Sequence, residues 1–209
     1  MNISIKLLDS LTTIDKRIKE AMADEINKRL RVAKGKIIKE AMGSIYNWVQ
    51  TQPEMQAMID DGPGSLSAMF GLEGSAGPKA VLAIARSVVE STEVEVTYYN
   101  KMLKNGGLWL KFQPANFKNL LSLPEGENQA YPEGHWLRHL LLSGNQTIVV
   151  GYHYTPGRGG RSGGGTMTSG GAWRVPPQYA GDEGNNFITR AFQGREKQIA
   201  DIFGRALKF

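Results

Sequence analysis

The chain has 209 residues, of which 41% are hydrophobic and 22% are charged, a composition typical of one folded globular domain. It contains no cysteine, which excludes disulfides, thiolate metal sites and cysteine nucleophiles. The longest apolar run, AVLAIA at 80–85, is too short to cross a membrane, and the start MNISIKLLDS lacks the apolar core of a secretory signal. We therefore expect no export and no membrane partner.

A long amphipathic helix is predicted over residues 12–48. Apolar residues recur every three or four positions from Ile14 to Trp48, which places them on one helical face, and Gly43 is expected to break the helix. Residues 28–39 carry six basic and no acidic side chains. They form either a solvated face or a surface for DNA or an acidic partner. The candidates for contact with nucleic acid are Lys28, Arg31, Lys34 and Lys39.

Short helices and one hairpin follow this helix in the sequence. The KNGG turn joins two strands, 94–99 and 108–112, as a hairpin. Prolines at the first turn and apolar spacing predict the helices, which we place at 53–61, 65–72, 78–92, 114–123 and 135–142.

A glycine-rich segment, PGRGGRSGGGTMTSGG at 156–171, lies between a strand at 146–154 and a strand at 172–175. Eight of its sixteen residues are glycine, so it buries too little apolar surface to offset the entropy of ordering, and we expect a flexible hairpin loop. It has no lysine and leads into a strand, which argues against a phosphate-binding loop. Arg158 and Arg161 are its candidates for contact with DNA.

The order of the elements predicts an α+β fold. After Pro176 and Pro177 the chain ends in two helical segments hinged near Gly194. We expect a single domain over 1–209, with an antiparallel sheet of about four strands and the long N-terminal and C-terminal helices packed on it.

No catalytic constellation is visible in the sequence. His135 and His139 are four positions apart, a spacing that zinc ligands use, and His153 is a possible third ligand. However, Trp136 replaces the glutamate of a metalloprotease helix, so ordinary, partly buried histidines are the favoured interpretation. No serine lies in a nucleophile elbow. We therefore expect no enzyme, no catalytic residue, no metal and no cofactor.

Aromatic residues concentrate on the predicted strands. They could stack single-stranded bases, but core and cross-strand packing is the favoured interpretation. These residues are Tyr98, Tyr99, Trp109, Phe112, Tyr152 and Tyr154.

Loose motifs in the first seventy and last sixty residues resemble the tail-completion, or neck, proteins of tailed bacteriophages. A long basic helix precedes a Gly-x-Leu turn, GSL at 64–66, and the strand-ending phrase WRVPPQY precedes NFITRAF at 186–192. That family's final helix commonly opens with Phe-x-x-Arg-Ala-hydrophobic, which Phe187, Arg190, Ala191 and Phe192 match. Residues 73–145 depart from the compact pattern, so an adaptor or tail-terminator position stays open.

The resemblance implies a structural virion protein that forms a homo-oligomeric ring at the head–tail junction and is assembled in the host cytoplasm. Its implied neighbours are portal or adaptor proteins and tail-terminator or tail-tube proteins, with non-specific contact to packaged DNA. Phe187, Arg190 and Phe192 are the candidates for the partner interface. Two alternatives are a free-standing nucleic-acid-binding protein that uses residues 28–39 and, less favoured, a histidine-metal hydrolase.

Overall fold

The computed structural model describes residues 8–113, 116–127 and 135–208. The fold is α+β, and it divides into two compact units. The first unit comprises Met1–Ala41, Glu93–Lys111 and Gln198–Phe209, and the second comprises Met42–Thr92 and Phe112–Lys197. The single-domain organisation stays a prediction.

The long helix α1 spans Leu11–Gln50, in agreement with the predicted helix. It continues through Gly43, so the predicted break is wrong. A glycine inside an exposed helix costs about 1 kcal/mol. The buried residues Ala41 and Ile45 on the adjacent turns hold the helix together across this position.

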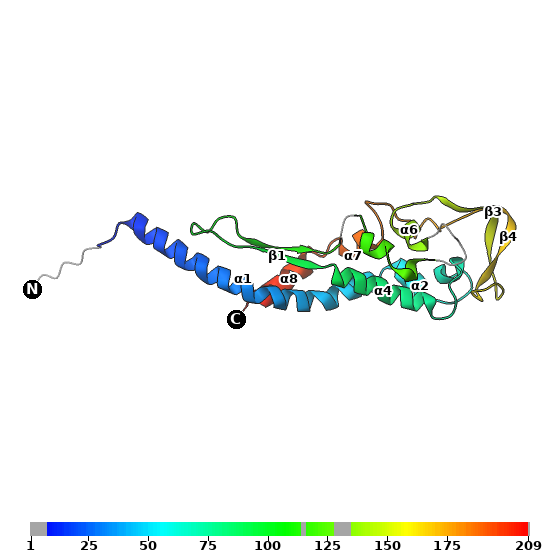
Figure 1. Cartoon of the computed structure of the whole chain (residues 1–209), viewed down its shortest axis with the longest axis horizontal. Coiled ribbons are helices and arrows are strands. Elements are labelled where there is room, and N and C mark those ends of the chain that lie inside the picture. The colour runs from blue at the N-terminus through cyan, green and yellow to red at the C-terminus, as the bar shows by residue number, and fades with distance from the viewer. Residues whose placement is uncertain (1–7, 114–115, 128–134, 209) are drawn as a thin grey trace, which may run out of the picture. The chain divides into compact units, whose positions relative to one another are not determined.

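In the first unit, a hairpin and the last helix accompany α1 (Figure 1). Strands β1 (Glu93–Thr97) and β2 (Gly107–Lys111) pair in antiparallel register. The Asn27 side chain donates to the Tyr99 carbonyl and accepts from the Tyr99 N–H, both at 2.8 Å, which fixes the hairpin on α1. Helix α8 (Glu196–Leu207) buries Ile202 and Ala206, and Arg205 pairs with Glu40 of α1 at 3.0 Å.

The second unit packs short helices around one apolar core. Its fully buried side chains include Met55, Met58, Ile84, Leu137 and Phe187. Besides the end of α1, the helices of this unit are α2 (Pro53–Ile59), α3 (Leu66–Met69), α4 (Ala76–Glu90), α5 (Lys118–Leu121), the 3-10 turn η1 (Pro124–Gly126), α6 (Trp136–Leu141) and α7 (Phe187–Phe192).

The second unit also holds the ribbon formed by β3 (Thr147–Pro156) and β4 (Gly165–Arg174). Among the described residues, the strands form two separate antiparallel sheets of two strands, so the predicted four-stranded sheet is wrong. Alternation and turn residues identify strands and pair the two that flank a turn. They carry no information on whether one hairpin joins another.

The glycine-rich loop is shorter than predicted. Strand β4 already begins at Gly165, which leaves residues 157–164 as the connection instead of 156–171. The sequence Thr-Met-Thr at 166–168 has ordinary strand propensity and pairs with residues 153–155 of β3, and the flanking glycines do not prevent this pairing.

Candidate functional site

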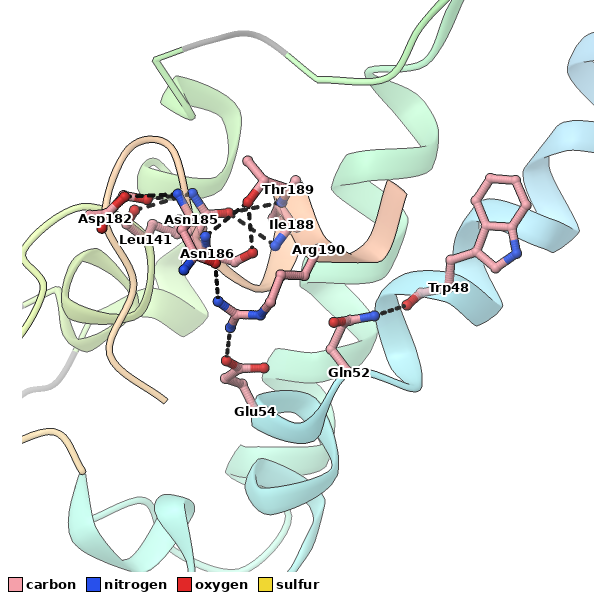
Figure 2. Close-up of polar contacts among 10 residues, drawn as sticks. All are labelled: Trp48, Gln52, Glu54, Leu141, Asp182, Asn185, Asn186, Ile188, Thr189 and Arg190. Carbon is pink, nitrogen blue, oxygen red and sulfur yellow. Dashed lines mark hydrogen bonds and ion pairs between the residues drawn. The ribbon is translucent and has the colours of Figure 1, made fainter. Parts of the chain in front are cut away.

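The three predicted interface residues lie in α7 and make contacts within the second unit. Phe187 is completely buried. Phe192 stacks on Phe112 with ring centroids 4.2 Å apart and meets Trp48 edge-on at 6.1 Å. Arg190 forms an ion pair with Glu54 of α2, as Figure 2 shows. A role of these residues in partner contact stays a prediction, and their visible role is to hold α7 against α2 and α1.

Glu54 is the most buried charged side chain of this cluster. It is 0% exposed, and its Oε2 atom has no hydrogen-bond partner among the described residues. Burial raises the pKa of Glu54, while its own backbone N–H and the Arg190 guanidinium oppose that rise. Sequence patterns did not point to Glu54, because its partner is 136 positions away in the chain.

Asn186 organises the start of α7 through both ends of its amide (Figure 2). Its side-chain oxygen accepts from the N–H groups of Ile188 and Thr189 at 3.0 and 3.1 Å, and the Thr189 hydroxyl closes a capping box. Its side-chain nitrogen donates to the carbonyls of Leu141 and Asp182 at 3.3 and 2.8 Å. An asparagine before an apolar helix start is the sequence signal for such a cap.

The tip of the β3–β4 ribbon, residues 157–164, is tied to α3 and the preceding turn. The Ser162 hydroxyl donates to the Ala68 carbonyl at 3.2 Å. The Tyr154 hydroxyl donates to the Gly164 carbonyl at 2.7 Å and accepts from the Gly64 N–H at 3.2 Å. A side chain at Gly164 would collide with the Cβ of Ala68, so the approach to α3 needs glycine there.

The two arginines of this tip differ in their surroundings. Arg161 pairs with Glu73 at 3.3 Å, which compensates its charge. Arg158 is exposed. Arg161 also lines a pocket of about 340 Å³ beside α3, together with Met69 and Tyr154. Both DNA-contact candidates are exposed, and they differ in that the charge of Arg161 is balanced by Glu73.

The basic candidates on α1 are all exposed. Lys28 and Lys39 are about three helical turns apart, which places them on the same side of the helix. Arg31 lies over the Tyr98 ring, with its guanidinium carbon 5.1 Å from the ring centroid. Lys34 is the fourth candidate. These side chains offer positive charge to solvent, but the structure contains no ligand that identifies a partner.

The histidines are placed apart from any metal-type cluster. No group of three or more potential ligands gathers within the described ranges. His153 binds the Gly170 carbonyl at 3.0 Å and the Thr168 hydroxyl at 2.9 Å, which engages both ring nitrogens. His139 is partly buried, and burial, with a smaller effect from Arg138, lowers its pKa and favours the neutral ring. His135 lies 3.4 Å from Glu127.

Two exposed apolar surfaces are the features that the sequence did not indicate. The N-terminal stripe consists of Leu11, Ile14, Ile18 and Met22 on α1, and three of these are strongly exposed: Leu11 by 77%, Ile18 by 53% and Met22 by 48%. The ribbon centre consists of residues 150–153 and 169–172, all exposed, with Val150 at 81% and Tyr152 at 47%.

The prediction that the aromatic residues of the strands lie in the core is wrong for part of this set. Trp109 and Tyr98 are exposed, as is Tyr152 of the ribbon centre, whereas Phe112 and Tyr154 pack within the second unit. Two-stranded sheets provide no second layer to cover both faces, which explains the exposed rings.

The comparisons with known proteins give no match: no protein family, no curated protein and no solved structure matches the chain. Among the described helices, none combines the length and apolarity that a membrane span requires.

Proposed function

We propose that the chain is a structural virion protein of a tailed bacteriophage, a ring-forming neck or tail-completion subunit. It joins the head connector to the tail and helps to retain or pass DNA. The motif resemblance names the class of assembly, and the N-terminal stripe is the structural observation that carries the proposal. Large apolar side chains on a regular helix are stabilised when a second protein covers them.

The stripe is a continuation of a helical face that the chain itself covers further along. Leu30, Ala33 and Ile37 lie on α1 at the same three-to-four-residue spacing and are buried in the first unit. Toward the N-terminus, Lys101 of the hairpin forms an ion pair with Glu20 of α1 at 3.8 Å. Apolar residues continue past this point to Leu11, and we assign them to contact with other subunits.

The basic residues complete this proposal. Lys28, Lys34, Lys39 and Arg158 are exposed and lie on regular or anchored segments, so a ring would present several copies of each. Repeated positive charge attracts the phosphate backbone without reading sequence. The portal or adaptor on one side and tail-terminator or tail-tube proteins on the other are the protein partners of this proposal.

Electron microscopy of assembled particles tests the proposal. We expect a ring of this chain at the head–tail junction, and particles that lack the chain should lose DNA or fail to join tails. Purified protein that stays monomeric at every concentration, alone and with connector components, would contradict it.

The second candidate is a free-standing nucleic-acid-binding protein, which the exposed Lys28 and Lys39 on one side of α1 favour. It predicts binding to duplex DNA that weakens steeply between low and physiological salt. Replacing Lys28, Arg31, Lys34 and Lys39 by glutamine should abolish that binding. Absence of binding by the unmodified protein at low salt excludes this candidate.

A further inference from the structure

The β3–β4 ribbon is fixed at both ends and open in the middle. At its root, Trp173 is buried and meets the Phe70 ring edge-on at 5.7 Å. At its far end, Tyr154 and Ser162 bind the turn at Gly64 and helix α3. Between these anchors all eight residues of the ribbon centre are exposed. An anchored ribbon is held in place for contact, whereas a loose hairpin would have to be ordered first.

Over most of their length, the outer edges of this ribbon carry no lysine, arginine, acidic residue or proline. Within the described residues the sheet has only β3 and β4, so each strand has one edge without a strand neighbour. Natural edges carry lysine, other charges or proline that discourage pairing. Strand β3 has a proline only at its last residue, Pro156, and β4 has a charged residue only at its last residue, Arg174. By contrast, β1 carries Glu93 and Glu95.

The side chains of the ribbon centre also permit close approach of another backbone. Strand β4 reads Ser-Gly-Gly-Ala at 169–172, and Gly170, with φ of +107°, has open space where a Cβ would stand. A bulge lies here, because Gly170 and Gly171 face the single residue Gly151. Beyond the bulge, Tyr152–Pro156 pairs with Gly165–Ser169 without a register shift.

We propose that neighbouring copies of this chain join edge to edge through these ribbons, with β3 of one copy beside β4 of the next. The result is one continuous antiparallel sheet around the assembly, to which each copy adds two strands. This inference rests on the proposed ring, and it names the surface and the geometry by which the ring closes.

Charge placement favours this arrangement over a two-fold pairing. The ribbon carries Arg174 at its root and Arg158 and Arg161 at its tip, with no acidic residue over 147–174. A two-fold pairing of β4 with β4 would run the ribbons in opposite directions and bring Arg174 beside the other copy's Arg158. Pairing of β3 with β4 keeps all tips on one rim and all roots on the other, so equivalent arginines of neighbouring copies are two strand spacings apart, about 10 Å, instead of one. It is also a head-to-tail contact, the kind that closes rings.

Single-cysteine variants test the geometry directly, since the chain has no native cysteine. The β3 variants are Val150→Cys and Tyr152→Cys, and the β4 variants are Ser169→Cys and Ala172→Cys. Adjacent strands lie about 4.8 Å apart, within the Cα separation that a disulfide spans. Mild oxidation should cross-link assemblies made from a β3 variant mixed with a β4 variant, and each variant alone should stay uncross-linked.

The outcomes separate this inference from the proposed function. Cross-linking within a single variant shows that like strands meet, which overturns the inference. A ring at the head–tail junction without cross-links in any mixture overturns the inference and leaves the proposed function intact. Failure to assemble, both alone and with connector components, overturns both.

A matched pair of lysine variants measures the contribution of the edge. Val150→Lys places a charge on the ribbon, and Val32→Lys makes the same change at a valine of α1 that is 52% exposed. We expect Val150→Lys to raise the concentration needed for assembly at least about tenfold, because a charge enters a strand-pairing contact. Val32→Lys should leave it unchanged, and both monomers should melt as the parent does. Equal effects of the two variants would overturn the inference.

Discussion

Helix α7 and the ribbon centre both belong to the second unit, yet their large side chains lie in opposite environments. At α7, the aromatic and charged residues Phe187, Arg190 and Phe192 turn inward and bind other elements of the unit. At the ribbon centre, Val150 and Tyr152 face solvent on a segment anchored at both ends. The residues of the α7 motif therefore pack within the unit, and the assembly contact that we propose uses a stretch without a motif.

Truncation of Trp173 should cause the largest loss of stability among the variants proposed here. It compares the anchored root of the ribbon with its exposed centre. Trp173→Ala deletes a buried ring that packs on Phe70, so the free energy of unfolding should fall by about 3–5 kcal/mol. Val150→Ala, on the same ribbon, should change it by less than about 0.5 kcal/mol. Urea denaturation of both variants measures the difference. Similar losses would mean that the ribbon centre is packed as tightly as its root.

Loss of Arg190 should have the next largest effect. Arg190→Ala leaves the buried Glu54 carboxylate without its cation, and we expect a loss of about 2–4 kcal/mol near neutral pH. Arg205→Ala is the matched control, because it removes an arginine that pairs with Glu40 on the surface and should cost less than about 1 kcal/mol. A small loss for Arg190→Ala, equal to that of the control, would contradict a structural role of Arg190 and favour the predicted role in partner contact.

Asn186→Ala tests the cap of α7. It removes the cap of two backbone N–H groups and leaves the Leu141 carbonyl without its donor, so we expect a loss of about 2 kcal/mol. Asn185→Ala, next to it and exposed, should cost less than about 1 kcal/mol. Thermal melting of the two variants at one pH compares them. Equal melting temperatures would show that the Asn186 cap does not contribute to the stability of this region.

The dependence of stability on pH that Glu54 causes is expected to be the smallest of these effects. Its pKa is raised in the folded state by burial, so its favourable contribution is present below the unfolded value of 4.5 and is lost as pH rises through the folded pKa. Glu54→Gln should therefore gain stability relative to the parent as pH rises from 4 toward 7. Denaturation profiles at several pH values in that range measure this. Parallel profiles for the two proteins would show that Glu54 is solvated.

Residues near each other in the chain determined much of the secondary structure. The three-to-four-residue apolar spacing predicted α1, the KNGG turn predicted the β1–β2 hairpin, and the break near Gly194 separated α7 from α8. Basic side chains at Lys28 and Lys39 were correctly expected on an exposed helical face. These features depend on helical period, turn geometry and capping, which act over a few positions.

Only the tertiary structure decided which side chains pair in the interior and which are exposed. Glu54 meets Arg190 across 136 positions, and the ribbon tip reaches Ala68 across 94. It also divided the strands into two sheets and left the middle of the ribbon exposed. Pairing and burial depend on contacts between residues that are far apart in the sequence. A local pattern of apolar or glycine residues therefore does not predict them.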